Sequence, residues 1–109
     1  MTPQQRSTKV LRERGWHVEV VEQTIRAGKL IFKRDMLGAF DLQCWPVDDR
    51  QEGTMLVQVT SASNHAARRT KIANEPRVAY ARRANQSLAL HSWRKDSKGK
   101  WQLREEDVS

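Results

Sequence analysis

The segment at residues 54–60, T-M-L-V-Q-V-T, constrains the fold more than any other part of the chain. It is a short and mostly apolar run, which is typical of a strand whose two faces are both covered. A strand of this kind belongs in the middle of a sheet, with other elements packed above and below it. The chain must therefore supply further strands beside it and helices to cover it.

The rest of the chain supplies those elements in the order α-β-β-β-α-α-β-β, which predicts a mixed α/β sandwich. Helix formers that end at Gly15 predict a first helix, and alternating or apolar runs predict the strands. Polar residues around Gly28 predict a loop. We expect helices at residues 5–14, 65–74 and 77–84, strands at 16–22, 38–47 and 54–60, a hairpin of 88–95 with 100–106, and a loop at 23–29. Residues 30–32 either continue the sheet or pack under that loop.

A length of 109 residues fits one domain, residues 1–109, with a single modest core. No apolar run approaches the roughly 18 residues that a membrane span needs, so no membrane association is expected. The single cysteine, Cys44, excludes an internal disulfide and any zinc site built on several thiolates. A reducing, cytoplasmic location is the expectation.

Positive charge is concentrated in the second half of the chain. Residues 1–54 hold nine Lys and Arg against eight Asp and Glu, a net charge of +1, whereas residues 55–109 hold eleven against five, a net charge of +6. Between Ser61 and Arg104 the only acids are Glu75 and Asp96. An isoelectric point of about 10.2 with this distribution is typical of a polyanion binder, most often a nucleic-acid binder, although a solvated basic face gives the same pattern.

Asp41 and Gln58 are the candidates for chemistry. Asp41 lies within an apolar strand pattern, where a carboxylate costs free energy unless it is paired or bound to metal. If the two central strands form a hairpin, Asp41 and Gln58 lie side by side, and Thr60 shares the face of Gln58. A structural alternative is a carboxylate at a strand end that pairs with an arginine or caps a backbone amide.

Other residues that often mark sites fit structural roles better here. The three histidines, His17, His65 and His91, lack metal-ligand spacing, and His91 is expected to pack or to touch phosphate. Cys44 lies among apolar residues and is expected to be buried. The four tryptophans are expected to be core or interface anchors. No Ser-His-Asp pattern is suggested.

The segments R-D-M-L-G-A-F-D-L-Q-C-W and M-L-V-Q-V-T-S, separated by a turn, resemble the core of the PD-(D/E)xK nuclease superfamily. Within it the chain is most similar to small Holliday-junction-resolvase-like proteins, many of them from phages. N-H-A-A-R-R-T-K-I and L-H-S-W-R-K add to the likeness, which covers about residues 16–108. It implies a restriction-endonuclease-like mixed sheet flanked by helices and, for a phage protein, the host cytoplasm.

The resemblance also implies a Mg²⁺ site, with Mn²⁺ as a substitute. Asp41 matches the first acidic ligand, Gln58 stands where the second acid usually lies, and the backbone carbonyl of Val59 completes part of the set. Asp35, six residues before Asp41, is either a further ligand or an acid that pairs with Arg34 or caps the following turn. Such oxygen ligands suit a hard cation, which stabilises charge on a scissile phosphate.

The chain departs from the family at Thr60, where a lysine that orients or deprotonates the attacking water is usual. Lys71, on the following helix, is the best replacement, and Lys33 and Arg34 are further options. The departure puts catalysis in doubt more than the fold. Glu13 or Glu22 could supply the acid that such proteins carry near the first helix, but each is more simply a solvated charge.

Three functions follow in order of preference: a metal-dependent endonuclease that cuts branched DNA as a homodimer, an inactive nuclease-fold module that binds DNA, and a structural partner in a larger assembly. A two-fold dimer suits a four-way junction, because two identical sites can cut two symmetry-related strands. The cations expected to track DNA phosphates are Arg68, Arg69, Lys71, Arg82, Arg83, Arg94 and Lys95.

Overall fold

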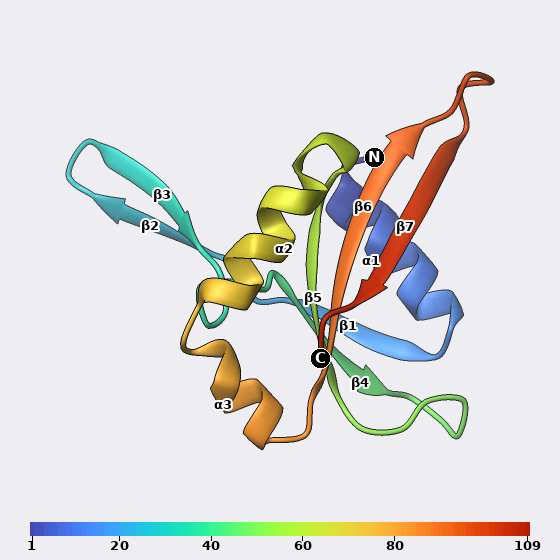
Figure 1. Cartoon of the computed structure of the whole chain (residues 1–109), viewed down its shortest axis with the longest axis horizontal. Coiled ribbons are helices and arrows are strands. Elements are labelled where there is room, and N and C mark those ends of the chain that lie inside the picture. Colours follow the sequence, from blue (N-terminus) through green and yellow to red (C-terminus); the bar gives the residue numbers. More distant parts are fainter.

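The computed structural model describes residues 1–109, apart from the side chain of Phe32. The described residues form a five-stranded sheet, a separate two-stranded sheet and three α-helices (Figure 1). In chain order the elements are α1 (Pro3–Glu13), β1 (Trp16–Val20), β2 (Gln23–Ala27), β3 (Leu30–Arg34), β4 (Leu42–Pro46), β5 (Met55–Ser61), the 3₁₀ turn η1 (Ala62–Asn64), α2 (His65–Asn74), α3 (Val78–Arg83), β6 (Ser87–Lys95) and β7 (Trp101–Asp107). The predicted mixed α/β domain is confirmed at this level.

Strand β5 lies in the centre of the five-stranded sheet, whose order is β1-β4-β5-β6-β7. It is antiparallel to β4 and parallel to β6, and the other neighbouring pairs are antiparallel. A parallel pair needs a crossover connection, which α2 and α3 provide. All residues from Leu56 to Thr60 are buried, as the apolar run at 54–60 predicts.

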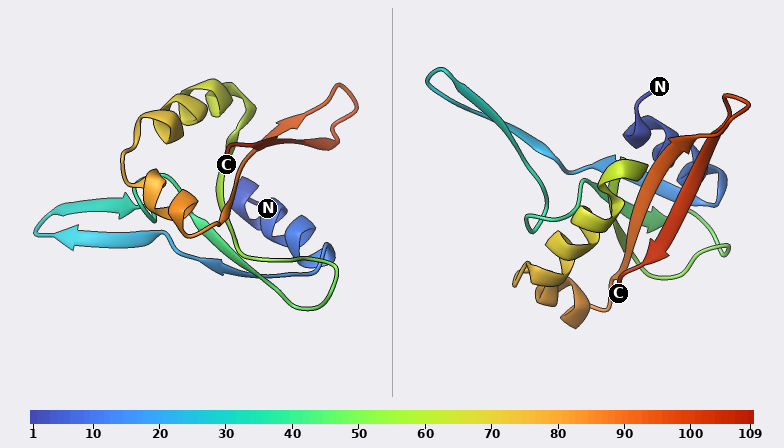
Figure 2. Two further views of the ribbon diagram at one scale, coloured as in Figure 1. Left: turned by 60° about the horizontal axis from the view of Figure 1, so that its bottom comes forward. Right: turned by 45° about the horizontal axis from the view of Figure 1, so that its top comes forward.

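Helices cover both faces of the sheet, because side chains along β5 alternate between two apolar clusters (Figure 2). Val57 and Val59 pack with Leu11 of α1, together with Trp16, Val18, Leu42, Cys44, Ala89 and Trp93. Leu56 packs with Ile72 of α2 and Val78 of α3, together with Ala39, Phe40, Ala81, Leu88 and Leu90. Cys44 is fully buried, as expected, and this burial raises the pKa of its thiol to about 12.

The helix ends follow local sequence signals. Thr2 and Gln5 form a capping box at the start of α1, where Pro3 occupies the first turn. Gly15, at φ +99°, turns the chain after that helix. Helix α2 ends at Asn74 because Glu75, which precedes Pro76, adopts an extended backbone. The predicted helices at both ends of the crossover are thus confirmed within a residue or two.

The loop predicted at residues 23–29 is wrong: this segment and the next form the β2–β3 hairpin, a two-stranded sheet of its own. Gln23 pairs with Arg34 and Ala27 with Leu30, and Gly28 at φ +62° occupies the turn. The hairpin extends away from the rest of the molecule (Figure 1). No residue of β2 is buried, so this strand lacks the apolar periodicity that marks a half-buried strand.

The strand predicted at residues 38–47 begins later, at Leu42. Leu37 and Gly38 have positive φ angles and form a tight turn, closed by an isolated bridge between Met36 and Phe40. Asp41 therefore lies one residue before β4 and not within it. Within the part of the chain that the structure describes, no helix is long and apolar enough to cross a membrane.

Candidate functional site

The candidate site lies where the pairing between β4 and β5 stops. The ladder ends at the pair Leu42 and Val57, while β5 continues to Ser61. Beyond that point the backbone N–H of Val59 donates to Oδ1 of Asp41 at 3.1 Å. The Asp41 carboxylate thus takes the place of a strand partner, and an acid is held at the free edge of a buried central strand.

A cavity of about 360 Å³ opens at this edge. It is lined by Glu22, Lys33, Asp35, Asp41, Gln58, Val59, Arg68 and Lys71. All the predicted metal and catalytic residues line it: Asp35, Asp41, Gln58, Val59 and Lys71. They come from three parts of the chain that are far apart in sequence.

Asp41 is 5% exposed, and its environment works against ionisation. Its pKa is raised from 3.8 to about 7, mainly by burial and to a smaller extent by the nearby carboxylates of Asp35 and Glu22. Hydrogen bonds from Gln4 and from the Val59 backbone act in the opposite direction. A cation at this position would favour the ionised carboxylate and so oppose the effect of burial.

Gln58 is 3% exposed, and only one of its two polar amide atoms has a hydrogen-bond partner. Its Nε2 donates to the carbonyl of Val59 at 3.2 Å, whereas Oε1 is buried and accepts no hydrogen bond. An unsatisfied buried acceptor costs about 1–3 kcal/mol, and such a group in a native protein calls for an explanation. A ligand that accepts electron density from Oε1 would provide one.

The donor set at the cavity fits a hard divalent cation. The Asp41 carboxylate, the Gln58 amide oxygen and the Val59 carbonyl are the oxygen ligands that Mg²⁺ accepts, usually with several waters. The fit depends on amide and carbonyl groups, because among the described residues no three His, Cys, Asp or Glu side chains lie close enough together to hold a metal ion.

Two lysines reach the cavity, and each contacts an acid there. Nζ of Lys71 lies 3.4 Å from Oδ2 of Asp35, and Nζ of Lys33 lies 3.2 Å from Oε1 of Glu22. Asp35 thus pairs with Lys71, and among the described contacts it forms no ion pair with Arg34. Thr60 is buried, whereas the side chain of Lys71 is partly exposed at the cavity and paired with Asp35.

The first helix contributes Gln4, which the sequence did not single out. Its Nε2 donates to Oδ2 of Asp41 at 3.2 Å and to Oε2 of Glu22 at 3.4 Å. Of the two acids considered near the first helix, Glu22 lines the cavity and Glu13 does not. A polar residue near the chain start carries no pattern that distinguishes it, and only the packing of α1 brings it to Asp41.

The cations predicted to contact DNA are not gathered into one surface. Arg68 and Lys71 lie at the cavity, but Arg69 is bound to Glu106 with an Nη2–Oε1 distance of 2.6 Å. Arg82 donates to the Val108 carbonyl. Arg83 is exposed at the end of α3, and Arg94 and Lys95 at the end of β6.

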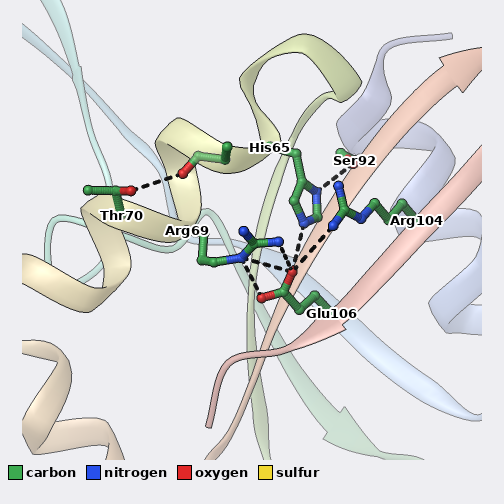
Figure 3. Close-up of polar contacts among 7 residues, drawn as sticks. His65, Arg69, Thr70, Ser92, Arg104 and Glu106 are labelled. Carbon is green, nitrogen blue, oxygen red and sulfur yellow. Dashed lines mark hydrogen bonds and ion pairs between the residues drawn. The ribbon is translucent and has the colours of Figure 1, made fainter.

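Two of the histidines hold buried polar networks. Nδ1 of His65 and Oγ of Ser92 lie 2.7 Å apart, and Nε2 of His65 lies 3.0 Å from Oε1 of Glu106 (Figure 3). Arg69 and Arg104 approach the same carboxylate. His65 is therefore not isolated in the fold, as it is in the sequence; it ties the start of α2 to β6 and β7.

His91 forms a second network on the opposite face of β6, with Ser7 of α1 and Glu105 of β7. Each network has a Ser-His-acid order. Both serines are at most 1% exposed, so neither can act as a nucleophile toward an outside substrate. The two networks instead anchor α1 and α2 on the two faces of the strand next to β5.

Comparison of the chain with protein-family models, with curated proteins and with solved structures found no match.

Proposed function

We propose that this protein is a metal-dependent endonuclease of the PD-(D/E)xK type that hydrolyses phosphodiester bonds in branched DNA. The observation that carries the proposal is the convergence of Asp41, Gln58 and Lys71 on one cavity, with Oε1 of Gln58 buried and unpartnered. These are the positions to which the resemblance assigns metal binding and catalysis.

The arrangement of strands supports the same assignment. The resemblance implies a helix, three antiparallel strands, a crossing helix and another strand, and the order α1, β1, β4, β5, α2, β6 is compatible with it. In this arrangement the β2–β3 hairpin is an insertion between the first two strands of the core, and β7 is an addition at the edge.

Asp41, Gln58 and the carbonyl of Val59 would hold Mg²⁺ or Mn²⁺, and Asp35, which lines the same cavity, would be a further ligand. The ion, when bound, supplies charge for the phosphate and lowers the pKa of a bound water. Lys71 donates a hydrogen bond from Nζ to a phosphate oxygen or to the attacking water. Asp35 holds that ammonium group at the cavity until substrate arrives. Arg68 supplies a second cation at the same wall.

A DNA-binding module without cleavage is the second candidate. Thr60 replaces the usual lysine and is buried, and Lys71 is already paired with Asp35. Glu22, Asp35 and Asp41 all line the cavity, but no three acids among the described residues lie close enough together to hold one ion. Each of these features weakens catalysis and leaves the fold and the net charge of +7 in place.

Cleavage of a synthetic four-way junction separates the two candidates. With Mg²⁺ or Mn²⁺, the wild-type protein and an Asp49→Asn control should nick the junction, and Asp41→Asn should not. Asp49 is an exposed acid outside the cavity, so the control changes the same functional group. Salt-sensitive junction binding without cleavage in either metal would favour the binding module.

The homodimer remains a prediction of the same proposal. Two active sites related by a two-fold axis would cut two symmetry-related strands of a junction. Analytical ultracentrifugation of the protein with and without junction DNA tests it, and a monomer in both conditions would contradict it.

A further inference from the structure

The β2–β3 hairpin, which we call the arm (residues 23–34), has an unusual composition. It carries four cationic side chains and no acid, whereas the rest of residues 1–54 holds five Lys and Arg against eight Asp and Glu, a net charge of −3. The cations are Arg26, Lys29, Lys33 and Arg34, and all four are exposed. The positive charge that is typical of a polyanion binder is therefore not confined to the basic second half of the chain.

The arm also exposes apolar side chains at its tip. Leu30 is 68% exposed and Ile31 is 65% exposed. They are successive residues of β3, directly after the turn, so they lie on opposite faces of the hairpin. A two-stranded hairpin alone is marginally stable in water, and this one forms a sheet of its own. Contact with a partner would cover the tip and stabilise the hairpin.

The arm begins and ends at the candidate site. Glu22 directly precedes β2, Asp35 directly follows β3, and both line the cavity together with Lys33 of the arm. A phosphate held beside Asp41 and Lys71 would place the neighbouring stretch of DNA along the base of the arm.

We propose that the arm binds the DNA duplex next to the cleaved phosphate, with the arm lying in a groove and its tip against the bases. This inference rests on the proposed function, because it takes the substrate in the cavity to be DNA. Five-residue strands make the arm about 17 Å long, and the major groove of DNA, about 12 Å wide, admits a two-stranded ribbon.

The strand register indicates that the arm binds in a groove and not on a flat surface. Arg26 pairs with Ile31 and Thr24 with Lys33, which places Arg26 and Lys33 on one face of the arm. Arg34 lies on the opposite face, which it shares with Leu30. Cations on both faces match a groove whose two walls are both lined with phosphates.

A second copy of the arm is a poorer partner. Pairing of two identical arms would bring eight cations together without an intervening acid, because each arm holds four. Cations along an exposed strand edge are a common means of preventing such edge-to-edge pairing. The charge therefore favours nucleic acid over self-association.

The test measures binding of a dye-labelled duplex and of a four-way junction by fluorescence anisotropy in EDTA, over a range of salt concentrations. Arg26→Ala/Lys29→Ala/Arg34→Ala should weaken binding on the order of tenfold to a hundredfold and lower the salt slope by about 2 to 3. Leu30→Ser/Ile31→Ser should weaken binding and leave the salt slope unchanged. All five positions are exposed, so these variants should fold.

Lys9→Ala/Arg12→Ala/Lys98→Ala is the matched control, since it removes three exposed cations from α1 and from the β6–β7 turn. The inference is overturned if the arm variant and this control lose equal affinity, if the wild-type protein binds no DNA at low salt, or if the arm variant changes only the oligomeric state. Arm-dependent binding without Mg²⁺-dependent cleavage would support the arm and refute the nuclease.

Discussion

The backbone amide of Val59 and the Asp41 carboxylate, 18 positions apart, are joined by a buried hydrogen bond of 3.1 Å. This bond completes the edge of β5 where β4 no longer pairs with it. It also fixes the acid in a place where ionisation is costly, so structure and chemistry depend on the same side chain.

The raised pKa of Asp41 should make the metal-free protein less stable as the pH rises. The folded state keeps its proton up to about pH 7, while the unfolded state loses it near 3.8, so stability falls between these values. The full difference corresponds to on the order of 4 kcal/mol. The free energy of unfolding in urea, measured in EDTA, should therefore be higher for Asp41→Asn than for the wild type at pH 8 and equal for the two proteins near pH 4. An equal difference at both pH values would contradict this explanation, and Asp49→Asn is the control.

Mg²⁺ should stabilise the wild-type protein, and replacement of the buried amide should abolish that effect. Gln58→Leu removes an unsatisfied acceptor, so its metal-free free energy of unfolding should stay unchanged or increase by about 1–3 kcal/mol. At a Mg²⁺ concentration of 100 times the Kd, the wild type should gain about 2.7 kcal/mol and the variant nothing. Thermal unfolding with and without Mg²⁺ measures both values. Equal stabilisation of both proteins would exclude Gln58 as a ligand.

Lys71→Met should reduce the rate of junction cleavage by about 10²–10⁴. Its side chain is 40% exposed, so the free energy of unfolding should change by no more than about 0.5 kcal/mol. Single-turnover cleavage at saturating protein isolates the chemical step. Lys71→Arg should keep binding but not full cleavage, because the larger planar guanidinium does not place its donors where the lysine Nζ lies. Full activity of Lys71→Met would contradict the role of Lys71 and favour Lys33 as the replacement for the missing lysine.

Glu106→Gln should loosen α2. Hydrogen bonds from Arg69 and His65 lower the pKa of Glu106 to about 2, so the ionised group stabilises the fold above its ordinary pKa of 4.5, and this contribution is lost as the pH falls toward 2. The variant should lose about 1–3 kcal/mol at pH 7 and differ little from the wild type near pH 2. Hydrogen exchange should increase in α2, and Glu52→Gln, at an exposed position, is the control. Unchanged exchange in α2 would contradict the anchoring role.

Elements with a buried face could be predicted from the sequence. The run at residues 54–60 identifies the central strand, and the composition of 65–74 with the following proline identifies α2, because burial and helix termination leave local patterns. Asp41 and Gln58 could be selected because polar groups within apolar strand patterns are unfavourable without partners. Their convergence on one cavity agrees with that expectation.

The parts that could not be predicted depend on contacts between distant segments or on the absence of burial. Nothing near Gln4 indicates that it reaches Asp41, 37 positions away, and the bond between His65 and Glu106 spans 41 positions. The arm was not predicted because β2, its first strand, has no buried residue to impose an apolar period. The ion pair of Arg69 likewise depends on Glu106 of β7, and a count of charges along the sequence does not reveal this contact.

The arm is connected to the rest of the domain at its two ends, directly after Glu22 and directly before Asp35. It shares no strand pairing with the five-stranded sheet. Hairpins of other lengths and sequences should therefore be graftable between these two positions without refolding the scaffold. Substrate preference and bond cleavage would then be free to diverge independently during evolution.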